Sequence, residues 1–97
     1  MKVEVHPEAS NELIFAKKWY EEKSEGLGNL FYNEINNAVE TIIKAPYTWP
    51  SYIDGTHRFV LRRFPFALIF FINNDLIQII AFMHFKRKPN YWKKRQF

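Results

Sequence analysis

The stretch from Phe66 to His84 reads FALIFFI-NND-LIQIIAFMH, which is two apolar runs separated by three polar residues. Runs of this length that are rich in Ile and Phe are typical of β-strands. Asn and Asp tolerate the left-handed backbone of a tight turn. We therefore predict a β-hairpin with strands over residues 66–72 and 76–84, and this hairpin is the centre of the expected sheet.

Both faces of this hairpin are apolar. With strict alternation, one face carries Phe66, Leu68, Phe70, Ile72, Leu76, Ile80 and Phe82, and the other carries Ala67, Ile69, Phe71, Ile77, Ile79, Ala81 and Met83. Two helices can cover only one face, so the other is expected to be an exposed apolar patch of the kind that binds a partner. The alternative is that the aromatic loop over residues 45–55 folds over this face. We favour the partner-binding interpretation.

Two further strands and two helices are predicted outside the hairpin. Residues 2–6 and 56–63 alternate as short strands. Between them, apolar residues recur every three or four positions, which predicts one helix over residues 7–26 and a second over residues 27–45. The second helix must stop there because Pro46 disfavours helical geometry in the residue before it.

The predicted order is β-α-α-β-β-β in an α+β fold, with a small antiparallel sheet packed on one face by an antiparallel helical hairpin. At 97 residues the chain fits a single domain, residues 1–97. The last part of the chain, residues 85–97, is a basic aromatic tail. Trp92 in this tail is expected to pack against the body, because so large a ring is seldom left in water.

Charge and cysteine content narrow the class of protein. Residues 1–45 carry five Lys and eight Glu, whereas residues 46–97 carry nine Lys or Arg and two Asp, for a net charge of +4 overall. A one-sided basic surface attracts phosphates or an acidic protein segment. The chain has no Cys, which excludes disulfides and thiolate zinc sites and favours a reducing cytoplasm. The longest apolar run is too short to span a bilayer, so we expect no membrane partner.

Two motifs resemble those of a known superfamily. Residues 58–70, RFVLRRFPFALIF, resemble the central hairpin of the RelE and ParE toxins, and residues 84–92, HFKRKPNYW, resemble the C-terminal signature of the same group. The segment HPEA at residues 6–9, before the first helix, also agrees with that group. The similarity is closest to the ParE-like members often called plasmid stabilisation proteins. Together with the element order it covers nearly the whole chain.

The resemblance implies a RelE/ParE-like fold and the toxin of a type II toxin–antitoxin system. Such a toxin inhibits growth in the cytoplasm, needs no cofactor, and is neutralised in a complex with an antitoxin that wraps around its sheet and helices. ParE-type members bind and inhibit DNA gyrase. RelE-type members are mRNA endonucleases that act in the ribosome without a metal. A third interpretation is an RNA-binding domain with no toxicity.

The endonuclease interpretation needs a base, cations for the phosphate and an acid for the leaving oxygen. Its candidate catalytic residues are Arg62, His84, Arg87 and Tyr91. Of these, only His84 has an ordinary pKa near neutrality, whereas Arg87 could hold a phosphate and Tyr91 could stack on a base. A single His at a strand end more often has a structural role, and we favour that role for His84.

The sequence departs from the nuclease pattern at Ala67. RelE-type nucleases resemble one another in placing an Arg early in this strand, and the loss of a cation that steadies the phosphate weakens the case for cleavage. We therefore favour a ParE-like toxin that acts by binding. The residues expected to contact the target or a nucleic acid are Arg58, Arg62, Arg63, Lys86, Arg87, Lys88 and Tyr91.

Neither a metal site nor a phosphate-binding loop is predicted. The three histidines, His6, His57 and His84, are too scattered along the chain to form a metal site. Gly26 and Gly28 are typical of a turn between two helices.

Overall fold

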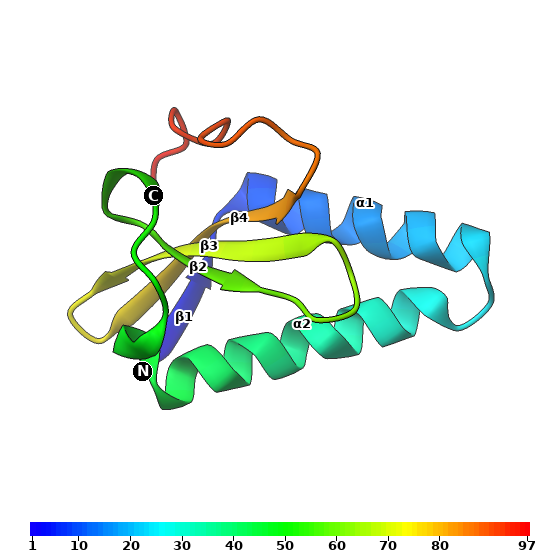
Figure 1. Cartoon of the computed structure of the whole chain (residues 1–97), viewed down its shortest axis with the longest axis horizontal. Coiled ribbons are helices and arrows are strands. Elements are labelled where there is room, and N and C mark those ends of the chain that lie inside the picture. Colours follow the sequence, from blue (N-terminus) through cyan, green and yellow to red (C-terminus); the bar gives the residue numbers. More distant parts are fainter.

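The computed structural model describes all 97 residues, and its element order is the predicted one. Strand β1 (Lys2–Val5) leads into helices α1 (Pro7–Lys23) and α2 (Leu27–Lys44), and then into strands β2 (His57–Val60), β3 (Phe66–Asn73) and β4 (Leu76–His84). Two single-turn 3-10 helices, Pro46–Thr48 and Ile53–Gly55, lie in the loop between α2 and β2. Figure 1 shows the helices as an antiparallel hairpin and the C-terminal segment, orange to red, folded back past β4.

The four strands form one mixed sheet in the order β1-β4-β3-β2. Strand β3 pairs antiparallel with both β2 and β4, as predicted. Strand β1 pairs with β4 in parallel, so the prediction of a purely antiparallel sheet is wrong. In the sequence, both helices lie between β1 and the other three strands. Any partner of β1 in the sheet is therefore far from it along the chain, and that partner is β4. Alternation in a four-residue strand carries no information about the direction of such a partner.

The β3–β4 hairpin forms where it is predicted, with Asn74 at a positive φ of 57° in its turn. Its register shifts between Ile69, which pairs with Ala81, and Phe70, which pairs with Ile79. Ile80 is therefore an extra, bulged residue in β4. A bulge of this kind changes which residues share a face on either side of it.

This bulge overturns part of the predicted division of β4. Ile77 and Ile79 pack under the helices, although strict alternation places them on the opposite face. Ile80 packs on the outer face of the sheet. Leu76 pairs with Asn73 and is assigned to the same outer face by this register. Strict alternation cannot anticipate the change, because the pattern assumes an unbroken ladder.

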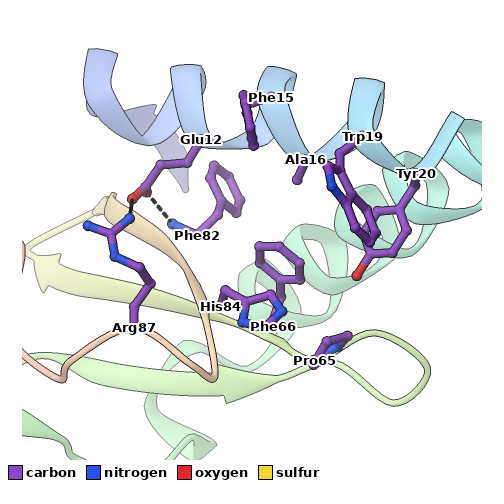
Figure 2. A pocket seen from close by; sticks show the side chains of 10 residues that line it. All are labelled: Glu12, Phe15, Ala16, Trp19, Tyr20, Pro65, Phe66, Phe82, His84 and Arg87. Carbon is purple, nitrogen blue, oxygen red and sulfur yellow. Dashed lines mark hydrogen bonds and ion pairs between the residues drawn. The ribbon is translucent and has the colours of Figure 1, made fainter. Parts of the chain in front are cut away.

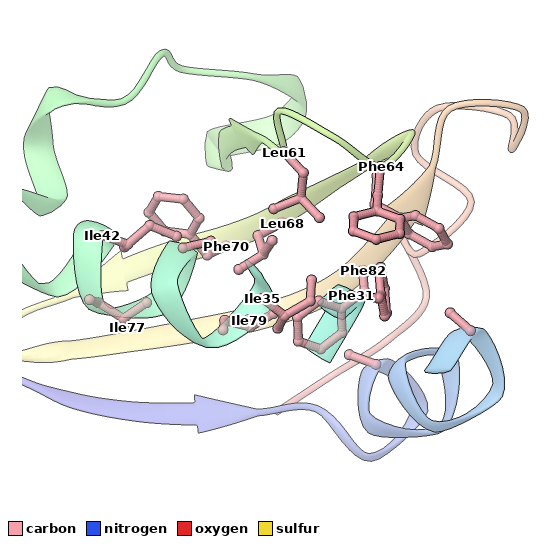
Figure 3. Close-up of a cluster of buried hydrophobic side chains, with 14 residues drawn as sticks. Phe31, Ile35, Ile42, Leu61, Phe64, Leu68, Phe70, Ile77, Ile79 and Phe82 are labelled. Atoms are coloured by element: carbon pink, nitrogen blue, oxygen red, sulfur yellow. The ribbon is translucent and has the colours of Figure 1, made fainter. Parts of the chain in front are cut away.

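The main core lies between the helices and one face of the sheet (Figure 3). The apolar residues that recur every three or four positions along both helices supply the helical members of this core. Tyr20, Phe31, Phe64 and Phe66 pack ring against ring, with centroids of four pairs 4.9 to 5.1 Å apart. Large rings bury much area per residue, which suits a small chain. The fourteen buried residues of this core are Ala9, Ala16, Phe31, Ile35, Ala38, Ile42, Leu61, Phe64, Phe66, Leu68, Phe70, Ile77, Ile79 and Phe82.

The outer face of the sheet is covered by the chain itself, so the predicted exposed apolar patch is absent. Trp92 of the tail is only 2% exposed, and it packs there with Tyr52 of the long loop and with Tyr91. The packing of Trp92 against the body is confirmed. The alternative, in which the loop over residues 45–55 covers this face, is correct in part, because the tail covers it as well. Five sheet residues are buried beneath this cover: Ala67, Ile69, Ile80, Ala81 and Met83.

The turn between the helices is confirmed, but α1 ends at Lys23, three residues before the predicted end at Gly26. Gly26 has a φ of 85° and directly precedes α2. The carboxylate of Glu21 accepts hydrogen bonds from the backbone N–H groups of Gly26 and Gly28, at 2.9 and 3.0 Å. A Cβ atom at position 28 would lie 2.6 Å from the carbonyl oxygen of Lys17. Glycine at this position therefore lets the two helices approach closely.

Candidate interaction site

Glu12 of α1 joins the tail to the sheet. Both of its carboxylate oxygens accept hydrogen bonds from the guanidinium of Arg95, each at 3.0 Å. The same carboxylate accepts hydrogen bonds from the hydroxyl of Tyr91 and, at 3.1 Å, from the backbone N–H of Phe82 in β4. The Glu12 side chain is only 15% exposed, so these partners take the place of water. Three separate parts of the chain thus meet at one carboxylate.

The local sequence explains why a charged side chain lies on this side of α1. Glu12 follows Ala9 by three residues and precedes Ala16 by four, so all three lie on one side of the helix. Both alanines are buried, and their small side chains let α1 approach β4. Strand β1 pairs with residues 76–79 of β4, which leaves the N–H of Phe82 beyond its end. Glu12 accepts the hydrogen bond that a longer β1 would accept.

Arg87 stacks on the ring of Tyr91 beside this carboxylate. The guanidinium carbon of Arg87 lies 3.8 Å from the centroid of the Tyr91 ring, and one of its nitrogens lies 3.9 Å from a carboxylate oxygen of Glu12. Burial, with the hydrogen bond to Glu12 and the charge of Glu12, raises the pKa of Tyr91 well above its ordinary value. Tyr91 is therefore a hydrogen-bond donor at neutral pH and holds the tail in place.

His84 ends β4 and is half-buried. Its ring lies edge-on to the ring of Phe66, and its Nδ1 accepts a hydrogen bond of 3.0 Å from the backbone N–H of Lys86. Burial and the charge of Lys86 lower the pKa of His84 below its ordinary value, so the ring is neutral at pH 7. With Nδ1 as acceptor, the neutral ring carries its proton on Nε2. These contacts fit the structural role favoured for His84.

An apolar groove of about 570 Å³ lies between α1 and the ends of β3 and β4 (Figure 2). Glu12, Phe15, Ala16, Trp19 and Tyr20 line it from α1, and Pro65, Phe66, Phe82, His84 and Arg87 line it from the sheet side. Phe15 is 72% exposed and Trp19 is half-exposed, so two large rings stand at its edge. Exposed apolar side chains gathered around one groove are typical of a binding site.

Arg62 and Arg63 lie in the turn between β2 and β3, where the predicted strand over 56–63 is wrong beyond Val60. The turn is held by Glu34 of α2, whose carboxylate accepts hydrogen bonds from the backbone N–H groups of both arginines, at 3.0 and 3.2 Å. The side chain of Arg63, which is 70% exposed, forms an ion pair at 3.2 Å with Glu34, whose side chain is 13% exposed. Both arginines line a different, more polar groove from that of His84 and Arg87.

The remaining predicted binding residues lie apart from one another. The guanidinium carbon of Arg58 lies 4.6 Å from the centroid of the Tyr52 ring, on the loop that helps to cover the outer face. Lys86 and Lys88 are exposed at the start of the tail. The structure thus brings His84, Arg87 and Tyr91 together and leaves Arg58, Arg62 and Arg63 elsewhere.

His84 and Tyr91, two of the candidate catalytic residues, both make hydrogen bonds within the chain. The lone pair on Nδ1 of His84 accepts a hydrogen bond from the backbone N–H of Lys86, and the Tyr91 hydroxyl donates a hydrogen bond to the carboxylate of Glu12. Ala67, at the position where the resemblance places an Arg in RelE-type nucleases, is fully buried beneath the tail. The site as arranged is suited to binding through apolar surface and positive charge.

Glu12 and Arg95 are functional candidates that the sequence pattern did not single out. Arg95 is one of six Lys and Arg residues in the tail, yet its side chain is mostly buried and also donates a 3.0 Å hydrogen bond to the carbonyl of Ile80. A signal existed for Glu12, since it shares a helix side with Ala9 and Ala16. No signal in the tail distinguishes Arg95 from its basic neighbours.

No group of three or more His, Asp or Glu side chains is placed to hold a metal ion. No helix combines the length and the apolar character needed to cross a bilayer.

Comparisons with known proteins identify the fold. No protein-family model and no curated protein sequence matches the chain. Among solved structures, a chain of the "Chromosomal ParDE TA system from P. aeruginosa" is similar, with a TM-score of 0.70 and 19% sequence identity. The similarity covers 87% of this chain and 95% of that chain. The chain therefore shares the fold of that ParDE chain.

Proposed function

We propose that this chain is the toxin component of a type II toxin–antitoxin pair, of the ParE-like kind that binds and inhibits DNA gyrase. The observation that carries the proposal is the fold shared with a chain of the ParDE structure, which extends over nearly all of that chain. The motifs at residues 58–70 and 84–92, which resemble those of the ParE and RelE toxins, support it independently.

The contacts of the candidate catalytic residues favour binding over cleavage. His84 and Tyr91 are both committed to hydrogen bonds within the chain. Arg62 lies in the groove beside Glu34, away from the groove that His84 and Arg87 line. A metal-free nuclease needs these groups at one phosphate, with a free base among them.

A supercoiling assay with purified gyrase and relaxed plasmid tests whether gyrase is the target. We expect supercoiling to stop when the chain is added in near-stoichiometric amounts, because a protein inhibitor of this size acts by occupying the enzyme. Relaxation of the same plasmid by a topoisomerase of another class is the control and should continue. Full supercoiling in the presence of excess chain would remove gyrase as the target.

The endonuclease is a second candidate because His84 and Arg87 line one groove and Tyr91 contacts Arg87. Mapping mRNA ends in a translating extract distinguishes the two mechanisms. Under the binding mechanism, transcripts remain intact when the chain is added. New mRNA ends that appear with the wild-type chain and disappear with the Arg87→Ala variant would support the endonuclease mechanism and contradict the binding mechanism.

The proposed partner is an antitoxin that neutralises the chain in a complex. The basic second half of the sequence fits an acidic partner segment. Co-expression with the protein encoded beside it is expected to restore growth and to give a complex that elutes as one species in gel filtration. Growth arrest that persists in the presence of the folded neighbour would exclude that protein as the antitoxin.

A further inference from the structure

The tail and the long loop together carry a basic surface over the outer face of the sheet. Trp92 is buried at its centre, with the rings of Tyr52 and Tyr91 at centroid distances of 6.1 and 5.2 Å. The guanidinium carbon of Arg58 lies 4.6 Å from the centroid of the Tyr52 ring. On the other side of Trp92, the guanidinium carbon of Arg87 lies 3.8 Å from the centroid of the Tyr91 ring. These two arginines and four exposed lysines of the tail make up the basic surface, the lysines being Lys86, Lys88, Lys93 and Lys94.

Few acidic groups lie among these six cations. Asp54, which accepts a 3.2 Å hydrogen bond from the side chain of Asn90, is the one acidic residue in the loop over residues 45–55, and the tail has none. Glu8 and Glu12 of α1 pair with Arg95, which is therefore not counted in the basic surface. So uneven a charge distribution gives a positive potential that attracts a polyanion.

The two arginines of the basic surface are close enough to contact one short polyanion. The steps from Arg58 through the three rings to Arg87 are 4.6, 6.1, 5.2 and 3.8 Å, so the two guanidinium groups are no more than about 20 Å apart, or about six base pairs of a duplex. Over that length each strand of a duplex carries about six phosphates. Several phosphates can therefore face the surface at once.

The basic surface fits a nucleic-acid backbone better than a protein. Of its six cations, only Arg87 lines either of the two grooves described above, and those grooves lie beside the helices. Protein partners bind mainly by burying large side chains in well-packed pockets. A nucleic-acid backbone binds through cations on an exposed surface, and its affinity depends on charge.

The aromatic rings of this surface favour a duplex over a single strand. Single-stranded nucleic acids bind by stacking successive bases on exposed rings. Here Trp92 is buried, and a guanidinium already lies over the rings of both Tyr52 and Tyr91. Phe85 is half-exposed, but a single ring offers no row on which successive bases could stack. A duplex keeps its bases stacked within itself and presents only phosphates and groove edges.

We propose that the basic surface binds the phosphate backbone of duplex DNA without reading its sequence. Both helices pack on the opposite face of the sheet, so this surface has no helix that could enter the major groove and contact base edges. The preference for a duplex backbone follows from the surface itself. The choice of DNA over duplex RNA rests on the proposed function, because gyrase acts on DNA.

A DNA-binding assay tests the proposal directly. The probe is a dye-labelled duplex of about 20 base pairs, roughly three times the span of the two arginines. Fluorescence anisotropy with the full chain is expected to give a Kd of about 1–100 µM at about 150 mM salt, as for non-specific DNA binding. With four of the six cations at phosphates, affinity should fall about fiftyfold between about 50 and 150 mM salt. A duplex of unrelated sequence should bind equally well.

Two pairs of lysines provide matched variants with the same change in net charge. The double variant Lys93→Gln/Lys94→Gln should weaken DNA binding at least about tenfold at about 150 mM salt and make the salt dependence shallower. The control is Lys18→Gln/Lys23→Gln on α1, which should change the Kd less than about twofold because salt screens distant charges. All four side chains are exposed, and circular dichroism should show both variants folded.

Several results would overturn the proposal. They are no binding of the duplex at about millimolar concentration of chain in low salt, an affinity that does not change with salt, and equal losses in the two double variants. Tighter binding of a single strand of the same length, of an RNA duplex or of poly-glutamate would assign the surface to that ligand instead. Gyrase inhibition without DNA binding would refute this proposal and retain the proposed function. DNA binding without gyrase inhibition would do the reverse.

Discussion

Replacement of Glu12 by Gln removes one negative charge at the point where α1, β4 and the tail meet. The variant keeps the size of the side chain, but it leaves the mostly buried guanidinium of Arg95 without its carboxylate. Tyr91 and the N–H of Phe82 also exchange a charged acceptor for a neutral one. Hydrogen bonds to charged groups contribute about 1.5–3 kcal/mol each, and breaking a fully buried ion pair costs about 3–5 kcal/mol.

Partial exposure of this pair reduces the expected loss, and we predict that Glu12→Gln lowers the free energy of unfolding by about 2–3 kcal/mol. For a domain of this size the corresponding fall in Tm is roughly 10–20 °C. Urea unfolding followed by far-ultraviolet circular dichroism measures the free energy of unfolding. An unchanged dependence of this free energy on urea concentration would show that the variant exposes the same surface on unfolding.

Glu8 provides the control for this experiment. It lies one turn before Glu12 on α1 and also pairs with Arg95, at 3.7 Å, but its side chain is 63% exposed. We expect Glu8→Gln to change the free energy of unfolding by less than about 0.5 kcal/mol. Equal losses for the two variants, or no measurable loss for Glu12→Gln, would refute the conclusion that Glu12 fixes the tail.

Three further predictions concern the tail, the end of β4 and the turn after β2. Trp92→Ala should cost about 3–5 kcal/mol and expose the outer sheet face, so binding of an apolar dye should rise; wild-type dye binding would contradict this. The pKa of His84 is lowered in the folded chain, so the unfolded chain takes up the proton first as pH falls; the wild type should lose stability below about pH 6.5, and His84→Gln should lose less. Identical pH profiles of urea unfolding for these two proteins would show that His84 contributes nothing. Glu34→Ala should cost about 1–2 kcal/mol because two backbone N–H groups lose their acceptor, whereas Arg63→Ala should cost less than about 0.5 kcal/mol because the Arg63 side chain is mostly exposed; the opposite order in thermal unfolding would contradict the role given to Glu34.

The elements that depend on local sequence were predictable. The hairpin over residues 66–84 and both helices follow from apolar periodicity and turn residues, and each lies within three residues of its predicted bounds. The bulge at Ile80 was not predictable, because nothing in a run of Ile residues marks where a ladder gains an extra residue. The parallel pairing of β1 was also hidden, since it depends on contacts between the two ends of the chain.

The candidate site depended mainly on long-range contacts. His84, Arg87 and Tyr91 were predicted together from one motif, and the structure places them near one another. Glu12, whose carboxylate binds Tyr91, is 79 residues away from it in the sequence. Trp92 was expected to pack against the body, but nothing in the tail indicated that Arg95 would also bind the sheet. The apolar groove lies beside α1, where the sequence showed a helix with an apolar stripe but gave no indication of a groove.

The most direct test of the central claim is growth after induced expression of the chain in bacteria, with the amount of folded protein measured in the same cells. If the chain is a toxin, growth stops soon after induction, and co-expression of its antitoxin restores it. Unchanged growth while folded chain accumulates would contradict the claim, whatever the similarity of its fold to the ParDE structure.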